Sequence, residues 1–252
     1  MGKRQVSLAS RLISFLRDTF RLIAGICLLP AAGAACYATS ILLYESIRDR
    51  NFSVPLLCGA VLYAAIAFLG RNRKNSSNAV YVFAHELSHA LAAISFGAKV
   101  FRIKVNRQSG SVRLSKSNFI IGLAPYFMPL YALMAALAYI AAAHFFPQHN
   151  LKPWFSAAAG FFLTFHFVHT IGILSGPMQP DIQEEGGMMF SFPVIIFFSC
   201  ISSLAIIIIM SESVRNAHEI LIIFIQYQKI FYIKSYYLLK YIYNFIFKFV
   251  SG

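Results

Sequence analysis

Three side chains that can do chemistry, His85, Glu86 and His89, fall within the motif HELSH of an otherwise almost wholly apolar segment, residues 79–97. On a helix the two histidines lie one turn apart on the same face, about 6 Å along the axis. Two imidazoles placed in this way can reach one Zn²⁺ at about 2.0–2.1 Å each, and Glu86 can then approach a metal-bound water. This HExxH spacing is typical of zinc metalloproteases, in which the glutamate is the general base.

The apolar surroundings of the motif strengthen this interpretation. An ionised side chain at the centre of a bilayer costs about 2.5–3.5 kcal/mol on insertion scales, so three ionisable groups in one turn must be paired, metal-bound or in contact with water. The alternative is a polar cluster satisfied by neighbouring helices. Another helix or a substrate could approach closely, because small residues surround the motif: Ala84, Ala90, Ala92 and Ala93.

The composition is that of a polytopic membrane protein. Of the 252 residues 58% are hydrophobic and only 12% are charged, which excludes an ordinary soluble domain. The formal net charge is +13, but the lysines and arginines are spread over the N-terminus, the loops and the tail, without the basic helix of a nucleic-acid reader. We therefore expect contact with the anionic headgroups of a lipid bilayer and no nucleic-acid partner. The four cysteines show no CxxC spacing, so neither a disulfide framework nor a zinc ribbon is indicated.

Apolar segments along the chain predict an all-α polytopic membrane protein with about six transmembrane helices. Each helix needs roughly 20 mostly apolar residues, and the segments that meet or approach this length are about 21–44, 54–70, 79–97, 119–146, 153–175 and 188–210. The fourth contains Pro125 and Pro129, which predict a kink or a broken helix. In the first, apolar sequence continues through Tyr44, which favours an uncleaved span over a signal peptide.

Residues 99–118, between the third and fourth segments, read as a small β-hairpin at the membrane surface. Their first part alternates between apolar and basic side chains, Ser109 and Gly110 form a turn signal, and residues 111–114 follow as a second strand. The hairpin would carry six basic residues. An irregular basic loop is the alternative.

We expect three regions along the chain: a basic N-terminal segment, 1–20; a six-span core, 21–210; and a basic aromatic tail, 211–252. Four lysines of the tail fall within an arc of about 140° on a helix, which favours a helix lying in the membrane interface. A seventh span is the alternative. The positive-inside rule leaves the orientation open. The N-terminal segment and the hairpin both carry the basic charge expected of cytoplasmic segments, but an odd number of predicted spans, three, separates them and would place them on opposite sides of the membrane.

Taken together, the motifs resemble the site-2 protease family of intramembrane zinc metalloproteases. The resemblance rests on HELSH in an apolar helix, on the hairpin that follows, and on the acidic motif SGPMQPD, residues 175–181, beside a later span. It covers about residues 79–190 and implies that His85, His89 and Asp181 bind Zn²⁺ and that Glu86 is catalytic. Within the Asp-bearing segment 176–187 the chain departs from the family pattern, because Ile182 stands where glycine is common, Gln179 is unusual and the opening asparagine is absent.

The residues by themselves leave the third ligand open. A catalytic zinc ion needs three protein ligands and an open position. Glu184 and Glu185 follow Asp181 within one turn and are rival ligands. His166 and His169 share a face of the fifth apolar segment, where they could bind a metal or orient a ligand by hydrogen bonding.

The function that the resemblance implies is hydrolysis of a peptide bond within or near a transmembrane segment of a membrane-protein substrate. A helix protects its own peptide bonds, so the substrate must be locally unwound, and the hairpin could add a strand to it. The alternative is a non-catalytic membrane scaffold, or a metal or proton transporter, that uses the same His/Asp cluster. Transport needs no base beside His85, so Glu86 favours the hydrolase. Short loops suggest the bacterial inner (cytoplasmic) membrane. Substrate identity, any prior cleavage and oligomeric state stay open.

Overall fold

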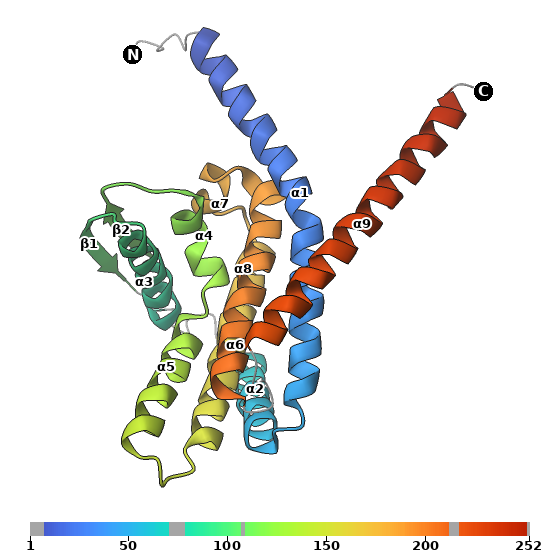
Figure 1. Ribbon diagram of the computed structural model, residues 1–252. Coiled ribbons are helices and arrows are strands. Elements are labelled where there is room, and N and C mark those ends of the chain that lie inside the picture. Colours follow the sequence, from blue (N-terminus) through green and yellow to red (C-terminus); the bar gives the residue numbers. More distant parts are fainter. Residues whose placement is uncertain (1–7, 71–78, 107–108, 212–216, 251–252) are drawn as a thin grey trace.

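The computed structural model describes residues 8–70, 79–106, 109–211 and 217–250, and it consists of helices with one small β-hairpin (Figure 1). In chain order the elements are α1 (Leu8–Ser46), α2 (Arg50–Gly70), α3 (Ala79–Ser95), β1 (Val100–Val105), β2 (Gly110–Leu114), α4 (Phe119–Phe127), α5 (Leu130–Phe145), α6 (Lys152–Leu174), α7 (Pro180–Glu184), α8 (Gly187–Met210) and α9 (Ala217–Val250). The described residues omit part of the expected N-terminal segment (1–7), part of the expected hairpin (107–108) and parts of the expected tail (212–216 and 251–252).

The predicted fold class is confirmed, but the predicted number of about six spans is not. By length and composition 4 helices, α1, α2, α6 and α8, can cross a membrane, and the number rises to 5 if α4 and α5 form one broken span. α3, the predicted HExxH span, has 17 residues. At 1.5 Å per residue it is about 26 Å long, shorter than the roughly 30 Å of a hydrocarbon core. The chain is nevertheless an integral membrane protein.

The fourth apolar segment is broken where its prolines predict a break. α4 ends at Phe127, α5 begins at Leu130, and the two helices are bent by 77°. Pro129 disfavours helical backbone at the residue before it, and Met128 is accordingly extended, with φ −101° and ψ 100°. The bend turns α4 into the bundle, where its side chains from Ile121 to Phe127 are all buried. α4 contacts α3, α7 and α8 there.

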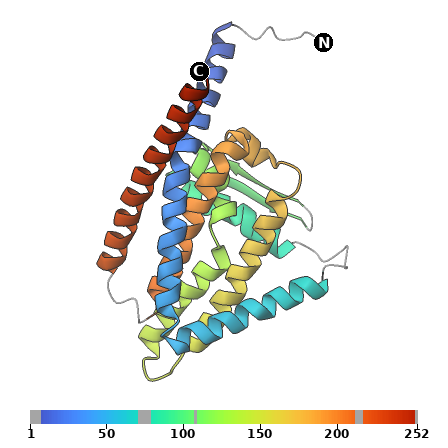
Figure 2. The same cartoon turned by 90° about the vertical axis from the view of Figure 1, so that its right-hand side faces the viewer.

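The other helices pack as pairs around this centre. α2 lies along α6 at close range, and glycines at the contact allow this approach. A Cβ at Gly59 would collide with the carbonyl of Ala157, and a Cβ at Gly160 with the carbonyl of Leu56. α1 lies along α8, and Figure 2 shows α2 running obliquely away from the end of α1. The candidate site lies outside these pairs, at the end of the bundle where α4 and α7 are located.

The tail forms one long helix, α9, whose first half packs against α1. The Tyr227 ring contacts the Tyr37 ring at a centroid distance of 4.4 Å, and the Tyr232 hydroxyl donates to the Cys27 carbonyl at 3.2 Å. Its second half diverges from α1 and extends away from the bundle (Figure 1). α9 is not among the helices that qualify as spans. Its position in the interface or as a seventh span stays a prediction.

The predicted β-hairpin is present. β1 and β2 pair antiparallel, from Val100 opposite Leu114 to Val105 opposite Gly110. The backbone N–H of Asn106 donates to the Ser109 carbonyl at 2.8 Å, beside the predicted Ser109–Gly110 turn signal. Apolar side chains of the hairpin pack against α3, and this packing places β2 beside the HELSH motif.

Candidate metal centre

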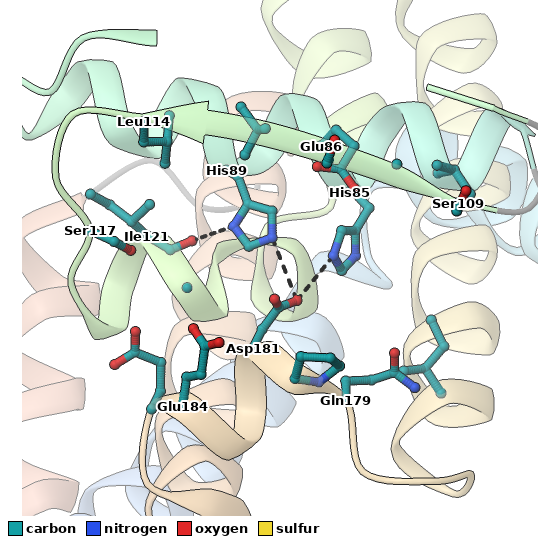
Figure 3. Close-up of a pocket in the computed structure, with 18 of the residues that line it drawn as sticks. His85, Glu86, His89, Ser109, Leu114, Ser117, Ile121, Gln179, Asp181 and Glu184 are labelled. Atoms are coloured by element: carbon teal, nitrogen blue, oxygen red, sulfur yellow. Dashed lines mark hydrogen bonds and ion pairs between the residues drawn. The ribbon is translucent and has the colours of Figure 1, made fainter. Parts of the chain in front are cut away.

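His85 and His89 of α3 meet Asp181 of α7 in one cluster (Figure 3). The Nε2 atom of His85 lies 3.3 Å from Oδ2 of Asp181, and the Nε2 atom of His89 lies 3.6 Å from the same oxygen. All three potential ligand atoms lie within 4.8 Å of one another. In a tetrahedral zinc site with bonds of about 2.0–2.1 Å, neighbouring ligand atoms are about 3.3 Å apart. The two separations that involve Asp181 are close to this value.

The hydrogen bond of His89 to the backbone defines which of its ring nitrogens is available. Its Nδ1 lies 2.7 Å from the Ile121 carbonyl oxygen, which only accepts hydrogen bonds, so Nδ1 carries the proton. In the neutral ring, Nε2 then directs a lone pair at the Asp181 carboxylate. Two acceptors in this arrangement repel each other unless a positive charge, a proton or a metal ion, lies between them. The chemistry of the donor set thus fits a bound cation.

His85 is held from behind by a chain of aromatic side chains. The Tyr81 hydroxyl lies 3.3 Å from Nδ1 of His85, on the side of the ring opposite to Asp181. The Tyr81 ring stacks on His169 at 4.9 Å, and Nε2 of His169 lies 3.0 Å from the Tyr63 hydroxyl. Contacts of this kind behind a ligand fix the orientation of its ring.

The rival ligands named from the sequence do not join this cluster. His169 belongs to the row of aromatic side chains behind His85. His166 is buried, and its Nε2 atom has no hydrogen-bond partner among the described residues. Glu184 is exposed and points its carbonyl at α1, and Glu185 forms an ion pair with Arg21 at 3.3 Å. Burial raises the pKa of the Glu185 carboxyl, and the Arg21 guanidinium opposes that rise.

Asp181 is fixed by neighbours on several sides. Tyr126 of α4 donates its hydroxyl to Oδ2 of Asp181 at 3.1 Å. The next residue, Ile182, is 1% exposed and anchors the short helix α7 in the core. Burial alone would raise the pKa of the Asp181 carboxyl, but hydrogen bonding and charge interactions with His85 and His89 hold that pKa well below its usual range. The carboxylate is therefore in the form that binds metals.

A cavity of about 830 Å³ opens onto the cluster. Glu86 lines it beside the histidines and is 7% exposed, and β2 lines it on the same side, from Gly110 onwards (Figure 3). Glu86 and β2 approach closely, because a Cβ at Gly110 would lie 2.5 Å from Oε1 of Glu86. An acid–base side chain, a donor set for a metal ion and a strand thus share one cavity.

Some contacts of this site were not foreseen from the sequence. The Ile121 carbonyl cannot be identified from a side-chain pattern, because any residue supplies a carbonyl. Tyr126 gave one weak signal, a hydroxyl within the apolar stretch GLAPYFMPL. Arg21 was counted only among the residues of an apolar span.

Comparison with known proteins adds one match. Residues 57–165 match the family model described as peptidase M50B-like. The matched region contains His85, Glu86, His89 and the hairpin, and it ends before Asp181. No curated protein and no solved structure matches the chain. The match confirms the relation to the site-2 protease family that the motifs indicated, and the part of this membrane protein that carries HExxH is peptidase M50B-like.

Proposed function

We propose that the protein is an intramembrane zinc metalloprotease that hydrolyses a peptide bond within or near a transmembrane segment of another membrane protein. The observation that carries the proposal is the convergence of His85, His89 and Asp181, from two separate helices, beside Glu86 in one cavity. The peptidase M50B-like match supports a membrane metalloprotease. The candidate spans support a lipid environment.

In this proposal each residue of the cluster has one task. Nε2 of His85, Nε2 of His89 and the Asp181 carboxylate hold Zn²⁺, which when bound would supply a Lewis acid that lowers the pKa of water and polarises a carbonyl. The Glu86 carboxylate accepts the proton of the attacking water and delivers it to the nitrogen of the leaving amine. Tyr126 keeps one oxygen of Asp181 hydrogen-bonded, which limits rotation of the carboxylate.

The substrate is assigned to the free edge of β2. β1 pairs with one edge of β2, and the cavity is lined by β2 residues between Gly110 and Leu114 but by no described residue of β1. An extended segment can add to such an edge through backbone hydrogen bonds. A transmembrane helix that unwinds locally would gain partners for the backbone groups it exposes, so the proposed substrate is a membrane-spanning segment rather than a soluble peptide.

Glu86→Gln tests the function. The amide cannot accept the proton, so cleavage of a transmembrane test substrate in liposomes should stop, while zinc per chain stays at the wild-type value. The matched control is Glu45→Gln, the same chemical change on an exposed side chain near the far end of α1, and it should cleave normally. Cleavage retained in Glu86→Gln would refute the assigned role. Zinc transport into the liposomes without proteolysis by the wild type would favour the transporter instead.

For localisation we propose the bacterial inner (cytoplasmic) membrane. The connection between α1 and α2 and that between α5 and α6 are short, which is the feature that suggested this membrane. Separation of inner and outer membranes from cells that produce the tagged protein tests the assignment, and recovery in another membrane fraction would overturn it.

A further inference from the structure

Arg21 connects α1, which lies outside the region matched to the peptidase family, to the segment that carries Asp181. One guanidinium nitrogen, Nη1, donates to the Glu184 carbonyl at 2.8 Å, and the other, Nη2, lies 3.3 Å from Oε2 of Glu185. The two charged side chains are only 21% and 13% exposed. Hydrogen bonds between charged partners are roughly twice as strong as neutral ones. The sequence distance of this contact is large, so it is a tertiary contact between two helices.

The segment between α7 and α8 is shaped around this arginine. Gly186 has φ +111°, and a Cβ there would lie 2.8 Å from Cδ of Arg21. On the other side Glu185 meets α4, because a Cβ at Gly122 would lie 2.8 Å from Oε1 of Glu185. The end of α7 is therefore wedged between α1 and α4, with Arg21 as its only cationic contact among the described residues.

α7 depends on contacts of this kind for its position. It has 5 residues, and isolated helices shorter than about 12 residues are marginal in water. Asp181 lies one turn before the clamped end, and the backbone N–H of Glu185 donates to the Asp181 carbonyl at 3.1 Å. A shift of the clamped end is thus passed to Asp181 through the backbone of a single turn.

We propose that Arg21 is a positioning residue for the metal centre: it clamps the end of α7 and so holds the Asp181 carboxylate within reach of His85 and His89. This inference rests on the proposed function, because it assumes that the three residues bind a metal. It assigns α1 a role in the site that neither the HExxH motif nor the family match contains.

The test is Co²⁺ titration of the metal-free, full-length protein in detergent, followed by the visible absorption of the bound ion. Arg21→Gln should weaken Co²⁺ binding by at least about 10-fold, the effect typical of contacts that orient a ligand, and should change the absorption spectrum. Arg21→Lys, which keeps the charge but loses the two-pronged geometry, should give an intermediate affinity. The matched control is Arg17→Gln, because Arg17 is on the same helix and, among the described residues, pairs only with its neighbour Asp18, both side chains being more than half exposed. It should bind as the wild type does.

Amide hydrogen exchange of residues 180–186, measured without metal, separates failure of the clamp from failure of the proposed function. Arg21→Gln should speed exchange there and leave α6 unchanged. Unchanged exchange would overturn the clamp, and so would faster exchange with unchanged Co²⁺ affinity. A wild type that binds no Co²⁺ would overturn the metal site itself, while the exchange data would still decide whether Arg21 holds α7. Should Arg21→Gln fail to fold, Glu185→Gln removes the same ion pair from the other side.

Discussion

Replacement of Gly110 by alanine should separate the chemistry of Glu86 from the binding of metal. A Cβ at this position would lie 2.5 Å from both Cγ and Oε1 of Glu86, whereas ordinary van der Waals contact is 3.4–4 Å. About 1 Å of separation must therefore be regained. The atoms in conflict belong to a flexible side chain and not to the backbone, so we expect the protein to fold and the Glu86 carboxylate to move.

The size of the effect follows from that displacement. A misplacement of about 1 Å at a reacting group can reduce the rate about 100-fold. Atoms of the proposed ligands His85, His89 and Asp181 are not among those nearest to the added methyl group. Gly110→Ala should therefore lower kcat about 100-fold for a transmembrane test substrate and leave zinc per chain unchanged.

The assay compares cleavage in liposomes with zinc content measured on the same preparation. The matched control is Gly172→Ala in α6, where the added Cβ would meet nothing within 4 Å, and it should cleave at the wild-type rate. A Gly110→Ala variant that cleaves within about threefold of the wild type would refute the placement of Glu86 against β2 in the active state. Loss of zinc together with activity would instead show that the hairpin supports the ligands.

Three further predictions concern the ligands and the packing of α1. Asp181→Ala should reduce zinc affinity at least about 100-fold, because two imidazoles alone do not complete a catalytic site, and metal analysis of the purified protein measures the loss. Tyr81→Phe removes the hydroxyl behind His85 and should weaken zinc binding about 10-fold in a competition with a chelator. The Sγ atoms of Cys36 and Cys200 lie 3.5 Å apart, so mild oxidation should join α1 to α8 by a disulfide and remove two of the four thiols that react in denaturant.

The two ligand predictions each have a control in the chain. Glu184→Ala removes a carboxylate from the same cavity and should retain zinc. Zinc kept by Asp181→Ala would contradict Asp181 as the third ligand and favour one of the rival ligands named from the sequence. Tyr131→Phe removes a hydroxyl that donates to the Val80 carbonyl at 2.8 Å rather than to a ligand, so equal losses in both tyrosine variants would contradict the orienting role. Four reactive thiols after oxidation would show that α1 and α8 do not pack as described.

Local patterns predicted much of this fold because local physics determines it. HELSH needed only the repeat of a helix to bring His85 and His89 onto one face, and alternation with a turn signal sufficed for the hairpin. Pro129 marked the break between α4 and α5, because proline restricts the residue before it wherever it stands. Membrane spans were harder. Apolarity identified α3, but its 17 residues fall short of a bilayer, and nothing in composition distinguishes a buried short helix from a crossing one.

The third candidate ligand depends on tertiary structure, which spacing does not contain. Asp181 is 92 residues after His89, and its closeness to the histidines results from contacts of α7 with α4, α8 and α1. Glu184 and Glu185 also carry carboxylates and lie one turn away, but they stay outside the cluster because the buried Ile182 fixes the rotation of α7. The resemblance to a protease family supplied Asp181 at the sequence level, and the residues alone did not.

The break between α4 and α5 has a consequence for the site as well as for the fold. The 77° bend lets α4 enter the space between α3 and α7. From there its Ile121 carbonyl accepts from His89 and its Tyr126 hydroxyl donates to Asp181. One short helix thus contacts candidate ligands from two other elements, and Arg21 of α1 binds the far end of α7. In the proposed site the HExxH helix supplies two ligands and the base, while α4 and α1, which carry none of the motif, help to hold His89 and the segment of Asp181 in place.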